Sequence, residues 1–133
     1  MWGLVYVLNE QIFKKVSIIT SVAITTLAAG VVLFIWAYLA GFLRRDFISI
    51  SSSNKLLWFV IAEVVIFILA ELLIALSITS KNATLSSLIE ISYPIFVSIF
   101  AYLIFRENEI NTGTVVGGLL IFIGVTTIYI FNK

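Results

Sequence analysis

Four long apolar runs, each close to the length that a helix needs to cross a bilayer, constrain this chain more than any single residue does. A membrane-spanning helix needs about 20 predominantly apolar residues, because each residue advances about 1.5 Å through a hydrocarbon core about 30 Å thick. The first run is longer than this, so we expect it to tilt or to extend into the interface. The runs extend from Val16 to Leu43, Leu56 to Ile78, Ala83 to Phe105 and Thr114 to Phe131.

The breaks between these runs are short and polar. Asn82 and Asn111 each stand where an N-cap of the following helix is expected. The runs lack the alternation of transmembrane barrel strands, and lipid forces backbone hydrogen bonds to form within each segment. The sequence therefore predicts an all-α, multi-pass transmembrane helical bundle of four full helices plus a short N-terminal helix. We expect the full helices near residues 16–43, 56–78, 83–105 and 112–131, with breaks around Arg44–Asp46 and residues 51–55, 80–82 and 106–109.

Composition agrees with a surface that faces lipid. Of the 133 residues, 62% are hydrophobic and 11% are charged, whereas a soluble domain carries about 25% charged residues. So few charges could not cover a water-facing surface, and we expect a multi-pass protein of the cell membrane. The chain contains no Cys and no His, which excludes disulfides, thiolate or imidazole metal sites and imidazole bases. With a net charge of +1 and no nucleophile beside a base, the sequence predicts no nucleic-acid partner, no cofactor and no enzyme.

The N-terminal segment is apolar but short. Met1 to Phe13 is apolar at first and then meets Asn9, Glu10 and Gln11. These residues would extend only about 20 Å as a helix, short of the hydrocarbon thickness. We interpret the segment as the end of a first transmembrane helix whose beginning is missing or whose start codon is misassigned. The alternative is a helix that lies in the membrane interface.

Basic residues near the helix ends normally set membrane orientation. Alternating the loops places Arg44, Arg45, Lys55 and Arg106 on one side of the membrane, and Lys14, Lys15, Lys81 and Lys133 on the other. This even division lacks the usual bias. Either a partner or a missing segment sets the orientation, or the chain inserts both ways and pairs with an inverted copy, as inverted repeats do in transporters.

Three acidic residues fall inside predicted spans: Glu63 and Glu71 in the second, and Glu90 in the third. A charged group at a helix centre costs about 2.5–3.5 kcal/mol on insertion scales, so such residues face protein or water. Glu71 and Glu90 are each about 10 Å from the turn that joins their helices, so we expect them at similar depth, where two carboxyls would share a proton. Alternatively, each carboxyl simply hydrogen-bonds a neighbouring helix. Glu63 lies nearer the opposite surface, where we expect it to snorkel or to pair with a polar neighbour.

Pro94 singles out Glu90 among these acids. A proline inside a helix lacks a backbone donor and clashes with the carbonyl of residue i−4, which here belongs to Glu90. Transporters place substrate sites at kinked helices in mid-membrane, although prolines also bend membrane helices for packing alone. Hydroxyl groups surround this position in the sequence, on Ser86, Ser87, Ser92 and Tyr93.

Glycines give the last run a different character. Gly113 and Gly117 form a small-xxx-small pair, and Gly118 and Gly124 continue the series. Small residues let helix backbones approach closely in lipid, so we expect these four glycines to mark helix packing. The pattern does not distinguish packing inside the chain from packing against another subunit.

The order of these motifs resembles the EamA-type domain of the drug/metabolite transporter superfamily. Residues 88–96 read LIEISYPIF, an acid follows at Glu107 or Glu109, and residues 117–125 read GGLLIFIGV. They match a proline midway through the fourth helix, an acidic helix boundary and a closing Gly-x-x-Leu-Ile-x-x-Gly-Val helix. Residues 2–7 resemble the second half of the first helix. The resemblance identifies residues 1–133 as a single EamA-like membrane domain with an incomplete first helix.

This resemblance implies a five-helix half-unit, whereas full members of the family carry two halves in inverted orientation. The similar small multidrug resistance proteins carry an essential carboxylate in their first helix, but Glu10 is displaced from that place towards Lys14 and Lys15, so we do not assign it that role.

The resulting hypothesis is a half-size transporter of a small metabolite or amphipathic compound, acting in the lipid bilayer as a homodimer or with a second homologous half. If transport is proton-coupled, the expected substrate- and proton-binding residues are Glu90, Glu71, Tyr93 and Pro94. Alternatives are a subunit of a lipid-linked sugar flippase, a non-transporting accessory subunit and a gene fragment.

Overall fold

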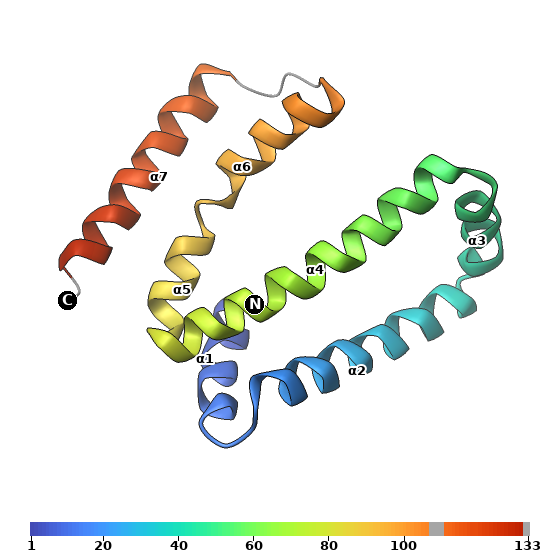
Figure 1. The fold of residues 1–133 in the computed structure, drawn as a ribbon, viewed down its shortest axis with the longest axis horizontal. Coiled ribbons are helices and arrows are strands. Elements are labelled where there is room, and N and C mark those ends of the chain that lie inside the picture. The colour runs from blue at the N-terminus through green and yellow to red at the C-terminus, as the bar shows by residue number, and fades with distance from the viewer. Residues whose placement is uncertain (107–110, 132–133) are drawn as a thin grey trace.

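The computed structural model describes residues 1–106 and 111–131, which form helices joined by short turns (Figure 1). No strand occurs within these ranges, which confirms the all-α class. Four apolar stretches are long enough to cross a membrane: 18–39, 54–80, 83–105 and 112–131. The elements are α1 (Trp2–Phe13), α2 (Ile18–Leu39), α3 (Phe42–Ser52), α4 (Asn54–Ser80), α5 (Ala83–Glu90), α6 (Tyr93–Phe100), the π-helical turn η1 (Ala101–Phe105) and α7 (Thr112–Phe131).

Side-chain caps begin the helices where the polar breaks predict them. Asn82 accepts a hydrogen bond from the backbone N–H of Leu85 at 2.8 Å, and Asn111 accepts one from Thr114 at 2.9 Å. Ser17 and Ser53 cap α2 and α4 in the same way. Each cap satisfies a backbone donor that has no partner inside its helix. The two asparagine caps predicted from the sequence are confirmed.

The end of the first long run differs from the prediction. Helix α2 ends at Leu39, and the chain then turns at Gly41, whose φ of 74° lies in the left-handed region. A separate helix, α3, follows across residues that the sequence analysis assigned to a polar break. Glycine adopts a positive φ without the Cβ clash of other residues, so Gly41 stops α2 and redirects the chain.

The pattern of α3 explains why its polar residues form a helix. Leu43, Phe47 and Ile50 follow the i, i+4, i+7 spacing of one helix face, and Leu43 and Ile50 are half-buried. The other face carries Arg45 and two serines at the same spacing. A charged amphipathic helix of this kind is suited to the membrane interface. Figure 1 shows α3 between the end of α2 and the start of α4, and it packs against both helices.

The span over residues 83–105, which the sequence predicted as one helix kinked by Pro94, is interrupted close to that proline. Helix α5 ends at Glu90, and α6 begins at Tyr93. Pro94 lacks the N–H that would continue the α-helical ladder, so the interruption falls just before it. The span ends in η1 and at Arg106, whose φ of 61° is also left-handed. The predicted boundary acids Glu107 and Glu109 lie outside the described residues.

Helix α1 packs against α4 and α5 near the turn that joins them (Figure 1). Tyr6, Ile78 and Ala83 form the core of this junction, and Phe13 and Ile74 pack around it. Most other large apolar side chains are exposed, as expected for helices that face lipid. Helix α1 is therefore joined to the bundle through its contacts with α4 and α5.

The two ends of the bundle carry the basic residues as the alternation of the loops predicts. The rings of Phe59 and Phe105 meet edge to face at 5.7 Å, so the start of α4 and the end of η1 lie together, next to Lys55 and Arg106. At the other end, Lys14 and Lys81 line one small cavity. Lys133, assigned to this second end, lies outside the described residues.

We predict that Gly41→Ala lowers the free energy of unfolding by about 1–2 kcal/mol, because an L-residue is strained in the left-handed conformation. Gly30→Ala is the matched control. Gly30 is inside α2, a Cβ there would meet nothing within 4 Å, and alanine favours a helix. Denaturant titration in detergent measures both variants. Equal stability of the Gly41→Ala and Gly30→Ala variants would contradict the role given to Gly41.

Candidate functional site

The polar centre of the bundle is a hydrogen bond between Tyr6 on α1 and Glu90 at the end of α5. The Tyr6 hydroxyl donates to the Glu90 carboxylate across 84 positions of sequence. Tyr6 is only 4% exposed, and Glu90 is half-buried. A buried carboxyl requires a partner, because desolvation without one is costly. The contact therefore ties the N-terminal helix to the point where the broken span changes direction.

Two further polar contacts hold α1 and α5 in place. The Glu10 carboxylate accepts a hydrogen bond from the backbone N–H of Ala83 at 3.4 Å. Together with the Asn82 cap, it supplies acceptors to the first turn of α5, where backbone donors are unpaired. The hydroxyls of Ser77 on α4 and Ser86 on α5 lie 2.8 Å apart. Glu10 thus caps a neighbouring helix, a role that the sequence analysis did not assign to it.

Glu71 approaches the same centre from α4. It lies close enough to Glu90 for the two carboxyls to interact electrostatically. Glu71 also lines a cavity of about 400 Å³ between α2 and α4. The other lining residues are mostly apolar, and Thr26 adds one hydroxyl. Glu71 is therefore positioned both beside Glu90 and at the wall of an apolar groove.

The other residues singled out from the sequence are not part of this hydrogen-bonded centre. Pro94 stands in the first turn of α6 and coincides with the break. Tyr93 is 60% exposed and points outward rather than into the buried junction. Glu63 lies on the exposed surface of α4, apart from the buried junction. The tyrosine that contacts Glu90 is Tyr6, which the sequence analysis did not single out.

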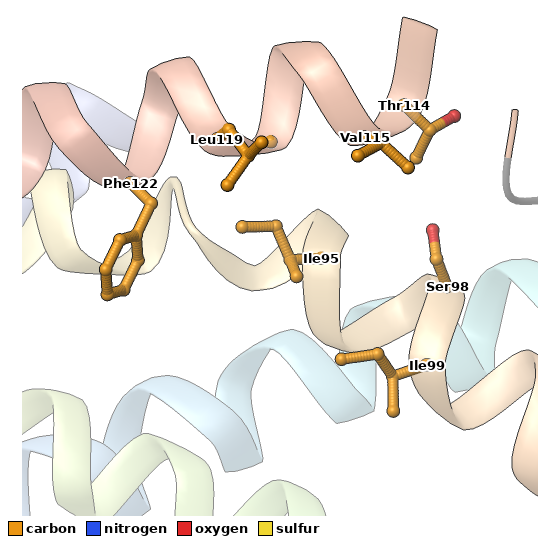
Figure 2. Close-up of a pocket in the computed structure, with 8 residues that line it drawn as sticks. Ile95, Ser98, Ile99, Thr114, Val115, Leu119 and Phe122 are labelled. Carbon is orange, nitrogen blue, oxygen red and sulfur yellow. The ribbon is translucent and has the colours of Figure 1, made fainter. Parts of the chain in front are cut away.

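A second cavity, of about 340 Å³, lies between α6 and α7. Figure 2 shows Ile95 and Ser98 of α6 and Leu119 of α7 pointing into the space between the helices. A Cβ on Gly118 would lie 3.1 Å from Cγ1 of Ile95, so this glycine permits the close approach of α6 and α7. At Gly117 and Gly124 a Cβ would meet nothing within 4 Å, and at Gly113 it would meet only the side chain of Asn111.

Within the described residues, no group of three His, Cys, Asp or Glu side chains is arranged to hold a metal ion. The chemistry of the centre is that of two carboxyls and a phenol. These groups can exchange a proton and attract a cation.

We predict that Tyr6→Phe lowers the free energy of unfolding by about 1–3 kcal/mol, because Glu90 loses its partner while the ring is kept. Tyr93→Phe is the control, because it also removes a tyrosine hydroxyl but from an exposed ring. It should change the free energy of unfolding by less than about 0.5 kcal/mol. Denaturant titration of both variants in the same detergent separates the two. An equal loss of unfolding free energy in both variants would show that the Tyr6 hydroxyl does not stabilise the junction.

Comparison with known proteins agrees with this architecture. The model of the EamA-like transporter family matches residues 1–130. No significant match was found among curated proteins or among solved structures. The match extends over almost the whole chain, and the four apolar spans fit a membrane protein. The chain therefore belongs to the EamA-like transporter family.

Proposed function

We propose that this protein is a half-size, proton-coupled transporter of the cell membrane that works as an antiparallel dimer and moves a small amphipathic compound. The observation that carries the proposal is the partly buried hydrogen bond from Tyr6 to Glu90, next to the break between α5 and α6. Membership in a transporter family supplies the general activity.

Glu90 is the proposed proton carrier. It is ionisable, half-buried in a candidate span, and adjacent to a discontinuity that would let α6 move relative to α5. Ionisable groups within a membrane commonly form proton relays, and broken helices line transport sites. Glu71 is the proposed second group, because its charge interacts with that of Glu90.

The groove beside Glu71 supports an amphipathic cation as the substrate. Its walls come from α2 and α4 and include Ile19, Val22 and Phe67, with the Glu71 carboxyl among them. Apolar walls with one acidic group complement a molecule that has apolar bulk and one positive charge. A cation bound beside Glu71 would also compete electrostatically with protons at this pair of carboxyls, which provides a route to coupled exchange.

The large exposed surface of the chain supports pairing with a second half of the transporter. The chain exposes 10597 Å², whereas a compact soluble monomer of this length exposes about 7,000 Å². Lipid can cover much of this surface. The open faces at Gly117 and Gly124, however, are of the kind that helices use against one another. The even division of basic residues between the two ends supports an inverted copy as the partner.

We predict that Glu90→Gln abolishes proton-coupled transport but leaves the protein folded, because glutamine preserves shape and hydrogen bonding and cannot release a proton. The test uses proteoliposomes that contain a pH-sensitive dye. Adding the lipophilic cation tetraphenylphosphonium outside should drive protons out with the wild-type protein and not with Glu90→Gln. The measurement is repeated at several pH values.

Glu63→Gln is the matched control, because Glu63 is also an acid within a span but lies on the exposed surface of α4. It should retain coupled proton movement. If Glu90→Gln retains pH-dependent transport, Glu90 is not the carrier and Glu71 becomes the candidate. If the wild-type protein moves no protons with the cation, the proposed coupling to this substrate class is wrong.

We also predict dual membrane orientation. The chain has no Cys, so single cysteines at Asn54→Cys and Ser80→Cys report the two ends of α4. A membrane-impermeant maleimide applied to intact cells should label part of each population. Complete labelling at one site with none at the other would establish a single orientation, and the second half would then have to be a distinct protein.

A further inference from the structure

The corner between α2 and α3 contains a cavity that the proposed transport mechanism does not use. It measures about 680 Å³. Phe34 and Tyr38, from the last turns of α2, form one wall, and Arg44, Phe47 and Ile48 of α3 form the other. Gly41 provides the turn between the walls. The cavity thus combines an apolar wall that continues into a membrane span with an arginine on an amphipathic helix.

The two walls of this corner are expected to lie at different depths of the bilayer. Helix α2 is long and apolar enough to cross the membrane, so Phe34 lies towards the hydrocarbon and Tyr38 is near the end of the span. Tyrosine side chains are enriched at this interface. Helix α3 has 11 residues, too few to cross the hydrocarbon, and its charged face fits the headgroup region.

The two adjacent arginines of α3 are in different situations. Arg45 forms an ion pair with Asp46 at 3.0 Å, and its guanidinium lies 5.5 Å from the centre of the Phe42 ring. Arg44 lines the cavity and, within the described residues, takes part in no ion pair. The positive charge at the cavity is therefore that of Arg44, whereas the charge of Arg45 is balanced by its neighbour.

From this arrangement we propose that the α2–α3 corner binds an anionic phospholipid of the surrounding leaflet. The acyl chains pack along Phe34 and Tyr38, and the phosphate accepts hydrogen bonds from the Arg44 guanidinium. Arginine recognises phosphate by paired hydrogen bonds, and a basic residue near the membrane surface attracts anionic lipid by about 1 kcal/mol. The site lies at the end of the bundle opposite Lys14 and Lys81 and does not depend on the role proposed for Glu90.

The adjacent arginines allow a sharp test. Arg44→Gln and Arg45→Gln remove the same charge from the same helix, but only Arg44 lines the cavity. The purified protein in neutral detergent is titrated with phosphatidylglycerol, with phosphatidylcholine of the same acyl chains and with inorganic phosphate, and Tm is measured. Native mass spectrometry of the same samples counts the lipids that remain bound. Both measurements are independent of transport.

For the wild-type protein and Arg45→Gln, we expect phosphatidylglycerol to raise Tm by several degrees more than phosphatidylcholine does, because a ligand that binds only the folded state stabilises it. Arg44→Gln should weaken phosphatidylglycerol binding about fivefold to tenfold and reduce this difference. Equal loss in both arginine variants would indicate diffuse attraction to the surface and overturn the site. Equal effects of the two lipids, or stabilisation by inorganic phosphate alone, would also overturn it.

If Arg44→Gln proves too unstable to purify, Ile48→Glu gives an independent test. It places a carboxylate one helical turn from Arg44 in the same wall of the cavity, where it would repel the proposed phosphate, so it should abolish the preference for phosphatidylglycerol. Ser49→Glu adds the same charge to α3 at a position that does not line the cavity. Loss of the preference with Ile48→Glu but not with Ser49→Glu supports the site, and the same response in both contradicts it.

Discussion

The bilayer cannot hydrogen-bond polar groups, and this constraint governs both the backbone and the few polar side chains of the protein. Four apolar stretches satisfy their backbone donors and acceptors by forming helices. The same constraint drives side chains to pair, and Tyr6 and Glu90 do so across the junction of α1 and α5. This contact, with the hydrogen bond between Ser77 and Ser86, holds together the best-buried part of a chain that otherwise exposes most of its apolar side chains.

The junction is also where the bundle is least regular. Helix α5 ends at Glu90, which is anchored by Tyr6, and α6 begins at Tyr93. On one side of this break the polar contacts fix α5 to α1 and α4. On the other side, α6 packs on η1 and α7, with a cavity between α6 and α7 (Figure 2). A chemical change at Glu90 therefore acts at the boundary between an anchored corner and a helical hairpin that has its own packing. The proposed proton coupling relies on this boundary.

At the opposite end of the bundle, the arrangement of the helices depends on a glycine turn. Gly41 ends α2 with a left-handed turn, and α3 then packs across the ends of α2 and α4. The turn separates an apolar wall from a charged one and creates the corner to which Arg44 contributes. A single glycine thus converts what reads as one overlong apolar run into a transmembrane helix followed by an interfacial helix.

The helical class, the four spans, the asparagine caps and the family resemblance could be predicted from the sequence, because they depend on local hydrophobicity, capping chemistry and the order of motifs. The sequence also indicated that Glu90 is unusual, since a carboxyl and a proline four residues later are visible in it. The partner of Glu90 could not be predicted in this way, because Tyr6 is 84 positions away and an apolar N-terminal segment gives no signal for which of its residues will be buried. Two further features likewise depend on helix packing and side-chain direction, which the local sequence does not show. One is the contact of Glu10 with α5, and the other is the difference between Arg44, which lines the cavity, and Arg45, which pairs with Asp46.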